Sequence, residues 1–147
     1  VTMDGECKER DAAAIDLGYR HSIYQTNGEA ICEVELQLKE GDKTAINAKI
    51  ADFTERRETK QPLEMASAGS TFKRPTGYYA GTLIQETGLK GLTVGGAQVS
   101  KKHAGFVVNT GTATAKDVLE LIHEVQRRVK EAHGVELHPE VRIIGEA

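Results

Sequence analysis

The sequence predicts an α+β fold in which helices cover one face of a mainly antiparallel sheet. Three patterns support this prediction. Residues 30–39 alternate between apolar and polar side chains, as a half-buried strand does. Apolar residues recur at helical spacing in 43–58 and again in 115–133. Between these two helices, a short Lys-Lys-His connection joins the strand-like segments 92–100 and 104–109.

The N-terminal region contains a turn, a short helix and the strand 30–39. The pair Asp4-Gly5 is a turn signal, and 7–10 is interpreted as the end of a hairpin strand. Asp11 is placed to cap a short helix over 12–17. In the strand that follows, one face consists of Cys32, Val34, Leu36 and Leu38.

The segment 43–58 is predicted to be a helix that ends before Pro62. Three cations, Arg56, Arg57 and Lys60, stand at its end, where they suit the negative end of the helix dipole without any ligand. Pro62 therefore marks a boundary between two regions. The apolar face of this helix consists of Ala45, Ile46, Ile50 and Phe53.

The C-terminal region contains two helices and three strands. A short helix begins near Tyr79 and is closed by Gly88, while Gly95-Gly96 indicates a bulge or a close approach of the backbone. Thr114 and Gly134 are suited to cap the two ends of the helix 115–133. The last strand is predicted over Glu140 to Gly145.

Composition limits the classes of function. The 147 residues suffice for one domain, or one domain and a piece of another, and the net charge of −3 with mixed signs does not indicate nucleic acid. No run approaches the ~18 apolar residues of a membrane span. Cys7 and Cys32 are interpreted as free thiols of a reduced cytoplasm, and no Cys/His spacing predicts a metal site. Because the chain opens at Val1 and its first residues read as the middle of a domain, we expect a fragment.

A run of small side chains at 66–71 is the first candidate for a site. Ser70 stands in this run, and Lys73 and Arg74 follow before Pro75. Small residues let a ligand approach the backbone, and cations hold an anion, so the segment suits an acidic substrate. The alternative is a Ser/Gly-rich surface turn.

The last predicted strand is the second candidate. Val141 and Ile143 would face the core, while Glu140 and Arg142 would share the opposite face. Residues two apart on one face lie roughly 7 Å from each other, close enough to line one pocket. The alternative is a solvated edge strand.

Five segments resemble one family in order and spacing. They are GYRHSIYQ at 18–25, RETKQPLEMASAGSTFKRP at 57–75, AGTLIQETGLKG at 80–91, KHAGFVVN at 102–109 and ELHPEVRIIGE at 136–146. Together they resemble the C-terminal half of bacterial UDP-N-acetylenolpyruvoylglucosamine reductase (UDP-N-acetylmuramate dehydrogenase), in the shorter form that lacks an extra tyrosine-bearing loop.

The resemblance implies a cytoplasmic flavoenzyme of peptidoglycan synthesis. In this family, FAD passes hydride from NADPH to the enolpyruvyl ether of UDP-N-acetylglucosamine, which gives UDP-N-acetylmuramate. Residues 1–60 would be the C-terminal part of the FAD-binding domain, and 61–147 the substrate-binding domain. The partners would be this UDP-sugar and the N-terminal FAD-binding half of the same enzyme, without which the chain is expected to be inactive. No nucleic acid, membrane or metal is implied.

The resemblance also assigns catalytic residues. Hydride transfer pushes negative charge onto the substrate carboxylate, so the reaction needs donors there and an acid that protonates the adjacent carbon. Ser70 matches the proton donor of the family. Arg20 and Glu140 match the residues that polarise the carboxylate and stabilise the enolic intermediate. His103 and Asn109 lie in a matching segment and receive no role.

Four further residues are assigned to binding. Arg57 and Arg142 match residues of the family that contact the flavin, and Lys60 matches a substrate-contacting lysine. Arg74 is expected to touch the diphosphate or the sugar, although the longer form of the family has asparagine there.

Two other functions are weighed against this one. The chain alone could be a UDP-sugar-binding module without activity, in which case a pure sample would be colourless, without flavin absorbance. It could also come from another flavoprotein with the same lobe, which would turn over an unrelated alcohol instead of the enolpyruvyl ether.

Overall fold

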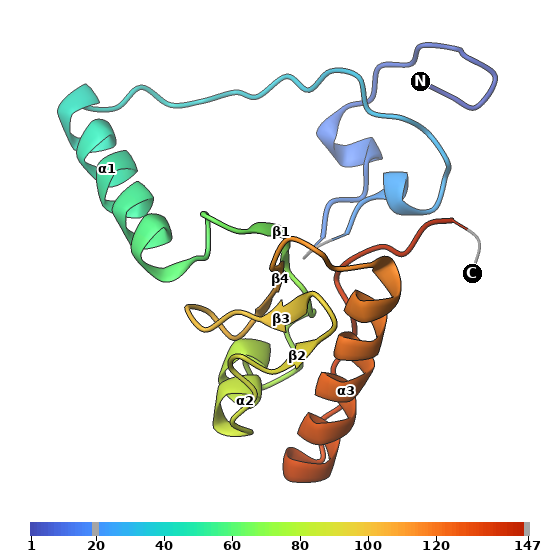
Figure 1. Ribbon diagram of the computed structural model, residues 1–147. Coiled ribbons are helices and arrows are strands. Elements are labelled where there is room, and N and C mark those ends of the chain that lie inside the picture. Colours follow the sequence, from blue (N-terminus) through green and yellow to red (C-terminus); the bar gives the residue numbers. More distant parts are fainter. Residues whose placement is uncertain (19–20, 146–147) are drawn as a thin grey trace. The chain divides into compact units, whose positions relative to one another are not determined.

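The computed structural model describes residues 1–18 and 21–145, and the chain forms two compact units, Val1–Asp42 and Lys43–Ala147 (Figure 1). The described part of the first unit contains two 3-10 helices, η1 (Ala12–Ala14) and η2 (Ile23–Gln25). The described part of the second contains three α-helices and a four-stranded sheet. No helix among the described residues is both long and apolar enough to cross a membrane.

The first unit has less regular structure than the sequence predicted. The turn at Asp4-Gly5 is present, because the Gly5 N–H donates to the Thr2 carbonyl at 3.0 Å. The predicted helix is only η1, and the side chain of Asp11 at its start makes no capping hydrogen bond. The prediction of a strand end at 7–10 was wrong, since these residues form neither helix nor strand.

The predicted strand at 30–39 is also absent. Ala30 exchanges backbone hydrogen bonds with Val1, but residues 31–42 form neither helix nor strand, and their apolar side chains are exposed, up to 82% at Leu38. A strand needs a neighbour for its backbone N–H and C=O groups. No strand among the described residues lies beside this segment, so its alternating pattern has nothing to pair with.

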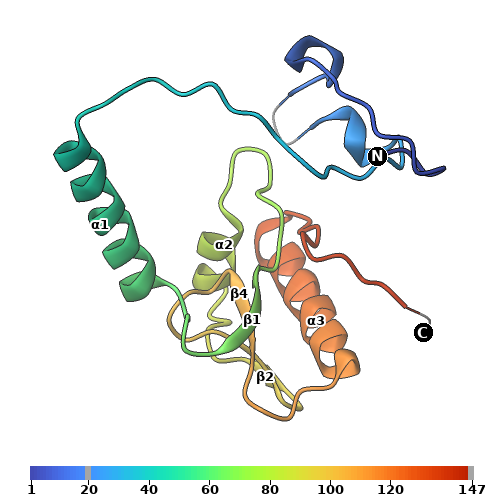
Figure 2. The same ribbon diagram turned by 90° about the horizontal axis from the view of Figure 1, so that it is seen from above.

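Helix α1 (Lys43–Lys60) forms as predicted and ends two residues before Pro62 (Figure 2). Its last turn carries Arg57 and Lys60. The apolar side chains that predicted it remain exposed among the described residues: Ile46, Ile50 and Phe53.

The sheet is antiparallel with strand order β1-β4-β3-β2. Its strands are β1 (Ala66–Ser70), β2 (Thr93–Val94), β3 (Ala97–Val99) and β4 (Phe106–Asn109). The single strand predicted at 92–100 is instead the β2–β3 hairpin, which turns at Gly95-Gly96. The expected close approach of the backbone is confirmed there, because a Cβ on Gly96 would lie 2.2 Å from the Ala113 nitrogen.

Helices α2 (Ala80–Glu86) and α3 (Ala115–His133) pack on one face of the sheet (Figure 1). Thr114 and Asp117 form a capping box at the start of α3, and Gly134 ends it in the left-handed conformation with φ 69°. This arrangement confirms the predicted α+β fold. The core between the layers includes Leu83 and Ile84 of α2, Leu121, Ile122, Val125 and Val129 of α3, and Ala97, Val99 and Val107 of the sheet.

The predicted last strand is reduced to a short pairing. Pro139 forms an isolated antiparallel bridge with Phe72, and the Glu140 N–H donates to the Thr71 carbonyl at 2.8 Å. Beyond Glu140 the pairing stops. Val141 still packs against the core, as expected, but the prediction that Ile143 faces the core was wrong, since it is exposed.

Candidate functional site

A bulge in β1 decides where Ser70 lies. Ser67 pairs with Val108, and Ser70 pairs with Phe106, so two residues of β1 stand opposite Val107 alone. Gly69 occupies the extra position with φ 89°, a conformation that few other residues adopt without strain. The Ser67 hydroxyl donates to the Val107 carbonyl at 2.8 Å and accepts from the Gly69 N–H at 3.2 Å. The run of small residues is therefore a bulged edge strand rather than the surface turn.

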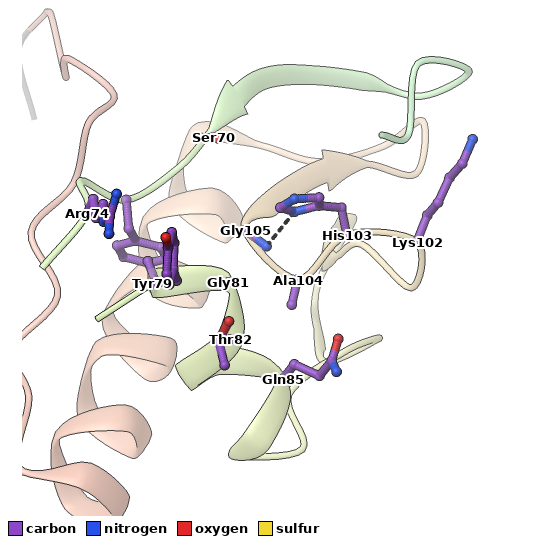
Figure 3. A pocket seen from close by; sticks show the side chains of 12 residues that line it. Ser70, Arg74, Tyr79, Gly81, Thr82, Gln85, Lys102, His103, Ala104 and Gly105 are labelled. Atoms are coloured by element: carbon purple, nitrogen blue, oxygen red, sulfur yellow. Dashed lines mark hydrogen bonds between the residues drawn. The ribbon is translucent and has the colours of Figure 1, made fainter. Parts of the chain in front are cut away.

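Ser70 lines an open cleft of about 390 Å³ (Figure 3). In Figure 3, Arg74 and Tyr79 lie on one side of it, and His103 and Lys102 on the other. Among the described residues that line it, none is Asp or Glu. The polar side chains of the cleft are therefore cations and neutral groups that can donate hydrogen bonds, with no carboxylate among them, which suits a ligand rich in anionic oxygens. The remaining lining residues are Phe72, Ala80, Gly81, Thr82, Gln85, Ala104 and Gly105.

Thr71 joins the cleft to the C-terminal tail through three hydrogen bonds. Its N–H donates to the Gly105 carbonyl at 2.9 Å, and its hydroxyl accepts from the Val107 N–H at 3.0 Å. Its carbonyl accepts from the Glu140 N–H at 2.8 Å. Because Thr71 follows Ser70 in the chain, the last of these bonds holds the backbone of the half-buried Glu140 close to that of Ser70.

The guanidinium of Arg74 is held at one side of the cleft. Its Cζ lies 4.0 Å from the centroid of the Tyr79 ring, and its Nε donates to the Tyr78 carbonyl at 3.3 Å. A guanidinium stacked on an aromatic ring keeps its two terminal nitrogens available to a planar anion. Arg74 is therefore placed to bind an acidic ligand beside Ser70.

The cation on the other side is partly engaged within the protein. Lys102 Nζ donates to the Glu58 carbonyl of α1 at 2.7 Å and lies 3.4 Å from the Glu64 carboxylate. The pKa of Glu64 is lowered by its own backbone N–H and further by Lys102. The cleft thus has Arg74 as its more available cation.

The predicted site residues fall into three groups. Ser70 and Arg74 line one cleft, with Glu140 attached through Thr71. Arg20 lies outside the described residues. The other three lie in the exposed last turn of α1 or the exposed tail, and none of them lines the cleft: Arg57, Lys60 and Arg142. No group of three or more His, Cys, Asp or Glu side chains in the described part of the chain is arranged to hold a metal ion.

Sequence reasoning missed the contribution of helix α2 and of the turn before β4. Thr82 and Gln85 of α2 line the cleft, as does His103 of the turn. For α2, the helical periodicity of the apolar residues could have indicated this contribution. Leu83 and Ile84 are buried, so Thr82 and Gln85 lie on the other face of the helix. No periodicity of this kind indicates that His103 lines the cleft.

The C-terminal region matches one known protein family. A family model described as UDP-N-acetylenolpyruvoylglucosamine reductase, C-terminal domain, matches residues 61–144. The chain belongs to this family. The resemblance inferred from the five segments is thereby confirmed.

Two relatives named UDP-N-acetylenolpyruvoylglucosamine reductase show how much of the family the chain covers. One from Clostridium perfringens (strain SM101 / Type A) is 60% identical over 97% of this chain and 48% of the relative. One from Limosilactobacillus fermentum is 53% identical over 99% of this chain and 48% of the relative. The chain spans about half the length of these curated relatives.

A solved structure of the family has a similar fold. The crystal structure of the reductase from Thermus caldophilus superposes with a TM-score of 0.68 at 44% identity. The match covers 84% of this chain and 44% of that one. The fold and the sequence therefore lead to the same family.

Proposed function

We propose that the chain is the C-terminal part of a cytoplasmic NADPH-dependent flavoenzyme of peptidoglycan synthesis, which reduces UDP-N-acetylglucosamine enolpyruvate to UDP-N-acetylmuramate. Family membership supports the activity, and the coverage of about half of each relative supports the need for an N-terminal FAD-binding half. The observation that carries the proposal is the Ser70 cleft, lined by donors and joined through Thr71 to Glu140.

We assign the substrate to residues 61–147 and the tail of an FAD-binding domain to 1–60. The family model for the C-terminal domain begins at residue 61, directly after α1 ends at Lys60. The donor-lined cleft lies wholly in the C-terminal region. A UDP-sugar carries a diphosphate and, in this substrate, a carboxylate, both of which are groups that such a cleft can bind.

In the proposed reaction, Ser70 gives its hydroxyl proton to the enolpyruvyl carbon next to the carboxylate, while hydride arrives at the methylene carbon. The two additions together reduce the double bond. Arg20 and Glu140 together polarise the substrate carboxylate and stabilise the enolic intermediate. Arg74 binds the diphosphate or sugar, and Lys60 contacts the substrate. A serine hydroxyl is a weak acid, so this step depends on neighbouring groups that assist the transfer.

Two arginines have the donor chemistry that a flavin needs. Arg57 and Arg142 are exposed, and neither forms an ion pair within the described residues. Guanidinium N–H groups suit the carbonyl and phosphate oxygens of FAD. When bound, FAD would accept hydride from NADPH and deliver it to the substrate. The chain's own contribution would be to orient these partners and to supply the proton.

Replacing Ser70 by Ala in the intact reductase tests the proposal by separating its two half-reactions. The variant should still show bleaching of the flavin when NADPH is added, because that step needs no proton from Ser70. Reoxidation by the enolpyruvyl substrate should slow by about 10²-fold or more, the usual contribution of a general acid.

A matched control removes another hydroxyl from the same sheet. Thr93→Ala lies on β2, at the opposite edge from β1, so both half-reactions should keep the wild-type rate. A Ser70→Ala enzyme that is reoxidised by substrate as fast as the wild type would refute the proton-donor assignment.

A further inference from the structure

Helix α1 ends with a carbonyl group that lacks its usual helical donor. Within an α-helix, the N–H of residue i+4 donates to the carbonyl of residue i. The donor for Glu58 would therefore be residue 62, but Pro62 has no N–H. The carbonyl before it is satisfied, because the Gln61 N–H donates to the Arg57 carbonyl at 2.8 Å. The Glu58 carbonyl is thus open to a donor from outside the helix.

Lys102 supplies this donor from the turn before β4. Its Nζ donates to the Glu58 carbonyl at 2.7 Å, and the same Nζ lies 3.4 Å from the carboxylate of Glu64. The ammonium therefore contacts the chain on both sides of Pro62, in the connection between α1 and β1. A cation at this end of a helix also suits the negative end of the helix dipole.

The turn that carries Lys102 is anchored within the C-terminal region. Ser100 is 1% exposed, and its hydroxyl accepts hydrogen bonds from the N–H groups of Lys102 and His103 at 3.1 and 3.2 Å. Figure 3 shows the Lys102 side chain extending from this turn away from Ser70 and Gly105. Although Lys102 lines the cleft, its ammonium is directed at the end of α1.

We propose that Lys102 is a positioning residue for Arg57, which it holds in place for the flavin by fixing the last turn of α1. This inference rests on the proposed function, because it takes Arg57 to contact the flavin. Arg57 directly precedes Glu58, so a fixed Glu58 carbonyl also fixes the backbone from which the Arg57 side chain extends. Without this bond the helix end frays, and fewer molecules present Arg57 in the orientation that binds FAD. In this role Lys102 contacts neither FAD nor the substrate.

Four variants of the intact reductase separate this role from other effects of the lysine. Lys102→Met keeps a long side chain but removes the ammonium, whereas Lys102→Arg keeps a cationic donor. Lys101→Met makes the same change at an exposed neighbour, which is not one of the described residues that line the cleft. Glu64→Gln removes the ion pair but leaves the bond from Lys102 to the Glu58 carbonyl.

The test measures the Kd of FAD by titrating the apoprotein of each variant and following flavin fluorescence. Lys102→Met should raise this Kd about threefold to tenfold, because the loss of a hydrogen bond from a charged donor lowers the fraction of molecules that are competent to bind. Lys102→Arg should restore most of the affinity. Lys101→Met and Glu64→Gln should stay within about twofold of wild type, since exposed charges and ion pairs contribute little.

A double-mutant cycle with Arg57→Met distinguishes positioning from a general loss of stability. In an enzyme without the Arg57 guanidinium, Lys102→Met should change the Kd of FAD by less than about twofold, because no guanidinium remains to be positioned. An equal effect of Lys102→Met with and without Arg57 would overturn the inference.

An unchanged Kd of FAD in Lys102→Met would also overturn it. If the Kd of UDP, measured by calorimetry, rose in that variant while the Kd of FAD stayed the same, Lys102 would be a ligand of the substrate instead. The Ser70 result would be unaffected by either outcome. A wild-type reductase that binds no FAD would overturn the proposed function, and this inference with it.

Discussion

Thr71→Val tests whether one buried hydroxyl satisfies the backbone N–H of Val107 next to the cleft. Thr71 is 3% exposed, and its Oγ1 accepts the Val107 N–H at 3.0 Å. Valine has nearly the same shape but cannot accept, so the N–H of Val107 would be left unpaired inside the sheet. An unsatisfied buried donor costs about 1–3 kcal/mol. Since the substitution leaves no cavity, the loss of this hydrogen bond should account for most of the change in stability.

The assay for Thr71→Val combines unfolding with amide exchange. At roughly 4 °C per kcal/mol for a domain of about 100 residues, Tm should fall by about 4–12 °C. The amide hydrogen of Val107 should exchange faster with solvent. Thr71→Ser is the matched control, because it loses a methyl group and some stability but keeps the acceptor, so Val107 should stay protected. Unchanged exchange at Val107 in Thr71→Val, or equal acceleration in both variants, would show that Oγ1 does not satisfy this donor.

Two further predictions concern the β2–β3 hairpin and the start of α3. Gly96→Ala would place a Cβ 2.2 Å from the Ala113 nitrogen, so the loop before α3 must shift. We expect the free energy of unfolding in urea to fall by about 1–3 kcal/mol. The control Lys116→Ala replaces an exposed side chain and should change it little. The pKa of Asp117 is lowered, first by the Thr114 N–H and then by the Gly96 N–H. The ionised carboxylate therefore stabilises the fold at pH values above the pKa that Asp117 has in the unfolded chain. This stabilisation is lost as pH falls through the pKa of the folded state. The difference in urea midpoint between wild type and Asp117→Asn should therefore shrink from about pH 5 downward, and a pH-independent difference would contradict this.

The elements whose signals are local could be predicted well from the sequence. Helix α3 begins after Thr114 and ends before Gly134, as expected, because a capping box and a left-handed glycine each act within one turn. Helix α1 ends before Pro62, because a proline also disrupts a helix locally, within one turn. The strands were predicted less accurately, because a strand forms only beside a partner strand. Residues 30–39 have the pattern of a strand and no neighbouring strand in the part of the chain that the structure describes.

The candidate site was predictable where its residues are close in sequence. Ser70 and Arg74 stand on one segment, and the structure places both at one cleft. The opposite wall of the cleft, with Lys102 and His103, comes from a turn more than 25 residues after Arg74 in the sequence. Periodicity does not show which segments so far apart in the sequence lie close together in space. His103 could only be recognised once the positions of Gly81 and Gly105 around its ring were known.

Main-chain features place Glu140 close to Ser70. Glu140 is held by its own backbone N–H on the Thr71 carbonyl, and Ser70 is turned by the bulge at Gly69. Neither of these main-chain features depends on the glutamate carboxylate or the serine hydroxyl. The backbone would therefore bring positions 70 and 140 together with other side chains as well. The proposed roles of the Ser70 hydroxyl and the Glu140 carboxylate are therefore tested by replacing these side chains, because such substitutions leave the main-chain hydrogen bond and the bulge in place.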